Sequence, residues 1–154
     1  MLTSNERKDY ILRMIAQVRR LVEALMGKVR DREGTDELLA QARESIGLLL
    51  GPMAGIAPRM DSVTAAQMVG DADVVAAWAE VTAAEGEVQR AAGDASAAAA
   101  SARRALELAV EAHLRSTSDI PELLALIARL RPQVDAASLL PRHRNALGEI
   151  AGAE

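Results

Sequence analysis

The N-terminal segment carries apolar residues at the spacing of one face of an α-helix. The stripe consists of Ile11, Ile15, Val18, Val22, Leu25 and Val29, widened by Met14, Leu21 and Met26. Intervals of three and four residues place these side chains on one side of a helix. Thr3 and Glu6 precede the stripe with the spacing of a capping box, and Gly34 follows it at a position typical of a helix end. The pattern predicts a long first helix with one buried face.

A second apolar stripe begins after a short polar turn. Its members are Leu38, Leu39, Ala42, Ile46, Leu49 and Leu50. Thr35 is expected to cap this second helix, and Gly51 with Pro52 is expected to stop it. Because the turn is short, residues 3–50 are predicted to form an antiparallel hairpin. We expect this hairpin to hold the greatest share of the burial energy, since its apolar side chains are large.

Residues 51–70 interrupt the helical pattern. Segment 51–61 contains two prolines and two glycines, which predicts a connector, and a short helix is expected from Ser62 to Val69. Asp71 is expected to begin a third long helix, and Gly93 with Asp94 is expected to end it and cap a returning helix. Residues 71–116 are therefore predicted to form a second hairpin.

Residues 119–151 are predicted to form the C-terminal helices. Asp119 and Glu122 have capping-box spacing, and Pro121 fits the first turn of a helix. The apolar face of this fifth helix is given by Leu123, Leu124, Ile127 and Leu130. A last short helix is expected from about Pro141.

These elements predict an all-α fold of antiparallel helical hairpins with about five to seven helices. Composition supports this prediction, because alanine is over-used, phenylalanine is absent, and Tyr10 and Trp78 are the only aromatic residues. Alanine has the best helix propensity, whereas strands favour aromatic and β-branched residues. A chain of 154 residues is near the commonest domain size, so residues 1–154 are expected to form a single helical domain.

The second hairpin resembles a tetratricopeptide-type helical hairpin. Small, turn and packing positions of that motif correspond to Gly86, Gly93, Asp94, Ala98, Ala105 and Leu106. The sequence departs from the motif at Thr82, Glu85, Gln89 and Ala102, where the motif places large residues. No repeat of 34 residues is detectable over the rest of the chain.

The phrase Asp9-Tyr10-Ile11-Leu12-Arg13-Met14-Ile15 resembles the start of a family of uncharacterised, tetratricopeptide-like bacterial proteins. The likeness continues in the Gly-Asp turn and in the alanine-rich helix that follows. This resemblance implies a tetratricopeptide-like array of helical hairpins, and it implies no particular activity.

Charge and cysteine content limit the classes of partner. The net charge is −4, and a basic patch interleaved with aromatic residues is missing, so no nucleic-acid partner is expected. No apolar run approaches the roughly 18 residues of a membrane span, so no membrane association is expected. Arg13, Arg19 and Arg20 interrupt any signal-peptide pattern, and the absence of cysteine excludes disulfides. A cytoplasmic location is the expectation that follows.

Motifs for catalysis, cofactors or metals are missing from the sequence. His113 and His143 lie on different predicted elements, and neither is preceded by the glutamate that a Glu-x-x-His metal motif requires. Each histidine is expected at the surface or at a helix end. The P-loop, the dinucleotide glycine fingerprint and the nucleophile elbow are likewise absent from the sequence. We therefore predict no enzyme activity, no cofactor and no metal.

Two functional hypotheses follow. The first is a non-catalytic protein-interaction or self-association module, as a homodimer or with an unknown protein partner. Its expected interface comprises Tyr10, Ile11, Met14, Val18, Leu21 and Leu25, because this band on the first helix is wider than one antiparallel neighbour covers. Alternatively, the fifth helix covers the other side of the band through Leu123, Leu124 and Ile127, which leaves a monomer.

The second hypothesis is a small-molecule-binding regulatory protein with a pocket between the hairpins. The expected pocket residues are Met53, Met60 and Trp78, because methionine side chains line pliable binding surfaces. Methionines also fill gaps in small cores, so the connector has a purely structural interpretation as well.

Overall fold

The computed structural model describes residues 3–30 and 34–152, and every regular element within them is helical. The α-helices are α1 (Ser4–Arg30), α2 (Thr35–Leu50), α3 (Ser62–Val69), α4 (Ala72–Ala91), α5 (Ala95–Arg115), α6 (Pro121–Leu130) and α7 (Pro141–Gly152). Four short 3-10 helices connect them: η1 (Gly51–Gly55), η2 (Ala57–Arg59), η3 (Arg131–Gln133) and η4 (Ala136–Ser138). The prediction of an all-α fold is confirmed.

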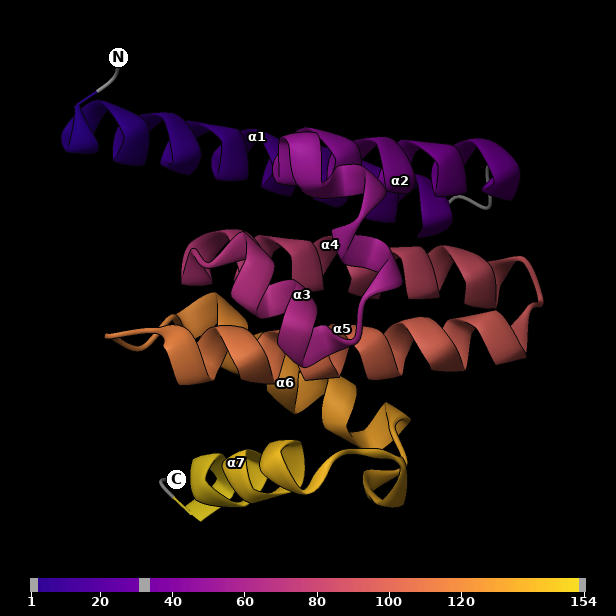
Figure 1. The fold of residues 1–154 in the computed structure, drawn as a ribbon. Helices are drawn as coiled ribbons and strands as arrows, with labels where there is room; N and C mark the ends of the chain where they lie inside the picture. The colour runs from indigo at the N-terminus through magenta and orange to yellow at the C-terminus, as the bar shows by residue number, and fades with distance from the viewer. Residues whose placement is uncertain (1–2, 31–33, 153–154) are drawn as a thin grey trace.

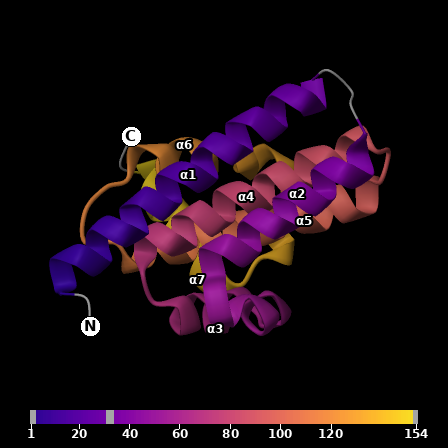
Figure 2. The ribbon, with the colours of Figure 1, turned by 90° about the horizontal axis from the view of Figure 1, so that it is seen from above.

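The helices are stacked in layers around α4 (Figure 1). Helices α1 and α2 form one outer layer and both pack on α4, which in turn packs along α5. Viewed from above, α1 and α2 lie over α4 and α5 (Figure 2). Helices α6 and α7 pack on α5 from the opposite side, and α3 with η2 covers its flank. Helix α4 therefore has neighbours on several sides.

Burial along α4 reflects this central position. From Val74 to Ala79 every residue is buried, and burial continues through most of the helix to Gln89. Alanine and valine make up most of this helix, and their small side chains allow its neighbours to approach closely. Helix α1, by contrast, buries Ile15, Val18 and Leu25. The expectation that the first hairpin holds the greatest share of burial is therefore wrong: α4 and α5 contribute most buried side chains.

Several helix ends follow the local signals in the sequence. The capping box of α1 forms, because Thr3 N donates to Glu6 Oε2 at 3.0 Å and Glu6 N donates to Thr3 Oγ1 at 3.1 Å. Asp71 accepts hydrogen bonds from the first-turn amides of α4, and Asp94 does so for α5. Gly93 between these helices has a φ of 83°, which suits glycine.

Two predicted end signals are not used. Helix α2 begins at Thr35 itself, and the capping position is taken by Gly34 with a φ of −50° and no side-chain bond. Helix α6 begins at Pro121, with Ile120 rather than Asp119 at the capping position. The φ of proline is already helical, so Pro121 sets this start without a capping side chain. Among residues 3–30 and 34–152, no helix combines the length and apolar character needed to span a membrane.

Candidate functional site

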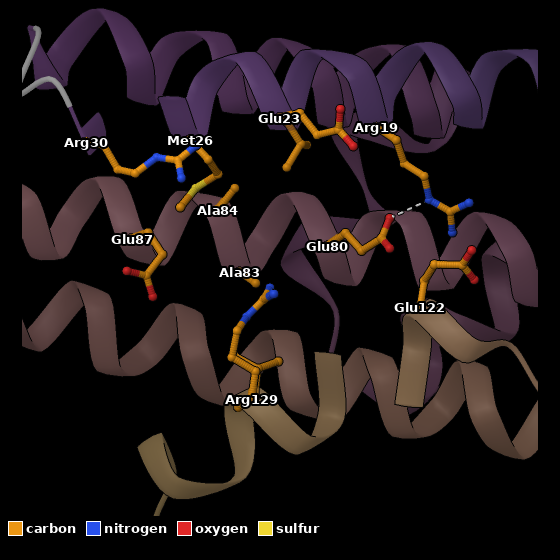
Figure 3. Close-up of a pocket in the computed structure, with 12 residues that line it drawn as sticks. Arg19, Glu23, Met26, Arg30, Glu80, Ala83, Ala84, Glu87, Glu122 and Arg129 are labelled. Atoms are coloured by element: carbon orange, nitrogen blue, oxygen red, sulfur yellow. Dashed lines mark hydrogen bonds and ion pairs between the residues drawn. The ribbon is translucent and has the colours of Figure 1, made fainter. Parts of the chain in front are cut away.

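A cleft of about 620 Å³ lies between α1, α4 and α6 (Figure 3). Its floor is apolar and consists of Val22, Met26, Ala83, Ala84 and Leu130. Its rim is charged and consists of Arg19, Glu23, Arg30, Glu80, Glu87, Glu122 and Arg129. The volume is within the range of ligand sites in proteins, and both a floor and a rim are features of binding clefts.

Helix α1 lines one long wall of the cleft. Its residues in the cleft follow the helical repeat, from Arg19 through Glu23 and Met26 to Arg30. The eleven steps along the helix from Arg19 to Arg30 correspond to a wall of roughly 16 Å. This side of α1 borders the face that it buries on α4, so floor and core are continuous.

An ion pair closes the cleft at one end. Arg19 Nε donates to Glu80 Oε2 at 2.9 Å, which joins α1 to α4 (Figure 3). Near the other end, Glu87 pairs along α4 with Arg90 at 3.4 Å. Arg129 reaches from α6 toward Ala83, and no ion pair among the described residues involves it. The cleft thus offers charges of both signs to an occupant.

The interface predicted on α1 is not one continuous surface. Val18 and Leu25 are only 1% and 3% exposed, so they belong to the core and cannot contact a partner. Ile11 and Met14 are half-buried against the core, whereas Tyr10 and Leu21 are 56% and 43% exposed. The physical reason is that α1 packs on α4 as well as on α2. These two neighbouring helices together cover an apolar band that is too wide for a single neighbouring helix.

The fifth predicted helix does not cover this band. Leu123 and Ile127 of α6 are buried, but α6 packs mainly on α5. The space between α6 and α1 is the cleft itself. No sequence pattern predicts that α1 and α6 lie on opposite sides of one cleft.

Of the three predicted pocket residues, the structure places one at a cavity. Trp78 lines a second cavity, of about 360 Å³, between α2, η1, η2, α4 and α5. Met53 is half-buried against the core and Met60 is exposed, and neither lines this cavity. Trp78 is instead covered by Arg104, whose guanidinium lies 5.3 Å from the ring centroid, at cation–π distance.

A polar cluster that sequence reasoning missed joins α5 to α7. Glu111 and His143 are both fully buried, and His143 Nε2 lies 2.8 Å from Glu111 Oε2. Arg142 donates to both carboxylate oxygens of Glu111, at 2.7 and 3.1 Å. Burial favours a higher pKa for Glu111, but the hydrogen bonds from Arg142 and His143 outweigh it and lower the pKa.

The position of His143 corrects the expectation of a surface residue. It lies in the first turn of α7, as a helix-end residue would, yet its side chain is inaccessible to solvent. Because Glu111 and His143 are buried between the two helices, the cluster fastens α7 to α5. Glu111 and His143 are 32 positions apart, so no local motif indicates their contact.

Within the part of the chain that the structure describes, no three His, Asp or Glu side chains gather as a metal site would require. Comparisons with protein-family models, with curated proteins and with solved structures each find no match to this chain. The resemblance to tetratricopeptide-like hairpins and to the uncharacterised bacterial family therefore stays a prediction.

Proposed function

We propose that this protein is a non-catalytic interaction module whose cleft between α1, α4 and α6 binds a helical segment of a partner. The observation that supports this most directly is the helical repeat of Arg19, Glu23, Met26 and Arg30 along one wall. A helix laid beside α1 meets these side chains turn after turn, as in helix-in-groove recognition.

The chemistry of the cleft suits an amphipathic helix. The apolar floor takes the apolar side chains of the partner, and the flexible side chain of Met26 adapts to their shape. The rim charges select the orientation and register of the bound helix, because like charges placed opposite each other are unfavourable. A small molecule would use only part of a wall of this length.

The partner is either another protein or a second copy of this chain. Light scattering coupled to gel filtration separates these cases. A mass near 16.3 kDa that does not change over the dilution series identifies a monomer that needs another protein. Twice this mass at higher concentration identifies a homodimer. Dissociation of the dimer on dilution then serves as the binding assay for the cleft variants.

The cleft itself is tested with two variants and one matched control. Met26→Glu introduces a charge at the floor, and Arg129→Glu reverses an exposed rim charge. Leu12→Glu alters an exposed apolar residue of α1 outside the cleft. We expect both cleft variants to lose the partner, or the dimer, while Leu12→Glu and the wild type retain it. Equal binding by all four proteins, with unchanged helix content, would exclude the cleft.

A further inference from the structure

The two side walls of the cleft, formed by α1 and α6, carry charges in the same order. On α1, Glu23 is followed seven residues later by Arg30. On α6, Glu122 is followed at the same interval by Arg129. Seven residues make nearly two turns, so the glutamate and the arginine of each wall share one helix face and lie about 10 Å apart along it. We call Glu23 and Glu122 the wall carboxylates, and Arg30 and Arg129 the wall guanidiniums.

The wall carboxylates lie toward one end of the cleft and the wall guanidiniums toward the other. In Figure 3, Glu122 lies at the Arg19 end, and Arg129 lies farther toward Arg30. Both glutamates that α4 contributes to the rim already pair with arginines, at 2.9 and 3.4 Å. The four wall groups are exposed, and no ion pair among residues 3–30 and 34–152 involves them. The cleft therefore offers unpaired negative charge toward one end and unpaired positive charge toward the other.

This arrangement specifies the charges of the partner, and the inference rests on the proposed function of the cleft. We propose that the bound helix carries a cationic and an anionic side chain seven residues apart on one face, beside its apolar stripe. The cationic side chain lies near the wall carboxylates and the anionic side chain lies near the wall guanidiniums, because opposite charges then meet on both walls. A helix with a single sign of charge would meet like charges at one end.

The order of the two charges in the partner sets its direction in the cleft. Glu23 precedes Arg30 along α1, so a partner whose cation precedes its anion runs parallel to α1, and a partner with the reverse order runs antiparallel. Ion pairs between exposed side chains are individually weak. The apolar floor therefore supplies most of the affinity, and the wall charges select among amphipathic helices.

The test uses three synthetic helical peptides with the same apolar stripe and two variable sites seven residues apart. The two sites hold Lys and Glu in the first peptide, Lys at both sites in the second, and Glu at both sites in the third. Binding to the full chain is measured by fluorescence anisotropy of a dye on the peptide. We expect the Lys/Glu peptide to bind about tenfold more tightly than either of the others, and we expect this preference to shrink at high salt.

Charge reversal on the walls makes the test specific. Glu23→Lys with Glu122→Lys leaves both walls basic, so the preference is expected to pass to the Glu/Glu peptide. The matched control, Glu44→Lys with Glu149→Lys, makes the same change of net charge at exposed positions outside the cleft and should keep the preference for Lys/Glu. Equal binding of all three peptides that Met26→Glu abolishes would overturn this inference and leave the proposed function standing. Tighter binding of a single-signed peptide, or no binding by any of the three, would also overturn it, and the natural partner or the dimer then tests the proposed function separately.

Discussion

Gly86 on α4 and Ser101 on α5 approach so closely that a Cβ at position 86 would lie 3.2 Å from the Cβ of Ser101. The same Cβ would lie 3.5 Å from the carbonyl oxygen of Ala98. Ser101 has little freedom to move, because it is buried and its hydroxyl donates to Gln89 Oε1 at 2.6 Å. The central helix pair thus depends on the missing side chain at position 86.

We predict that Gly86→Val lowers the free energy of unfolding by about 1 to 3 kcal/mol, because overpacking forces two tightly packed helices apart. Urea denaturation followed by circular dichroism measures the change. Gly27→Ala on α1 is the matched control, since a Cβ there meets nothing within 4 Å and alanine is the better helix former. Equal stability of Gly86→Val and the wild type would show that the helices separate without cost.

The buried cluster at Glu111 gives a second prediction. Glu111→Gln is expected to cost about 1 to 3 kcal/mol, because it removes the charge-assisted hydrogen bonds from Arg142 and weakens the contact with the buried His143. Glu87→Gln removes one partner of a half-exposed pair and is expected to change stability by less than about 1 kcal/mol. Thermal and urea unfolding of both variants test the contrast. A mild effect of Glu111→Gln would mean that α7 is held by its apolar side chains alone.

The lowered pKa of Glu111 predicts a loss of stability in acid. A carboxyl whose pKa is lower in the folded state stabilises the fold fully above its ordinary pKa of 4.5, and that contribution disappears as the pH falls through the folded-state pKa. Urea unfolding between neutral pH and the acid range measures this loss. Glu111→Gln should show a shallower decline below pH 4.5 than the wild type. Parallel curves for the two proteins would assign the acid transition to other groups.

Glu85 predicts the opposite pH dependence. Burial raises its pKa, so its contribution is fully present below the ordinary value of 4.5 and is lost as the pH rises through the folded-state pKa. Glu85→Gln removes the buried charge and should therefore be more stable than the wild type at neutral pH. The difference in unfolding midpoint should shrink as the pH falls toward 4.5. If Glu85→Gln is less stable than the wild type at neutral pH, the charged Glu85 side chain stabilises the fold and the prediction is wrong.

The stripe on α1 predicts graded effects of a buried charge. Ile15 is 3% exposed, so Ile15→Asp places an unpaired charge in the core and is expected to cost several kcal/mol or to unfold the protein. Val22 is half-buried in the floor of the cleft, so Val22→Asp should cost less. Circular dichroism melting of the two variants gives the order. Equal melting temperatures would contradict the packing of α1 on α4.

The sequence alone predicts the helices and many of their ends, because these features depend on neighbouring residues. Thr3 with Glu6, Asp71, and Gly93 with Asp94 act within one turn of the chain, and each forms the expected local structure. Where two local signals compete, as Asp119 and Pro121 do, the sequence does not say which one sets the helix end.

Tertiary structure decides which helix faces meet, because this depends on contacts between distant segments. The band on α1 is periodic in the sequence, but packing on both α2 and α4 determines that Val18 and Leu25 are buried. The sequence does not indicate that α4 is the central helix. Its many alanines predict a helix, but they do not predict which other helices pack against it. The cleft, the ion pair of Arg43 with Glu85 and the contact of Glu111 with His143 each join helices that no local pattern pairs. The residues in each of these contacts lie far apart in the sequence. They meet because the folded chain gains free energy by packing its whole apolar core.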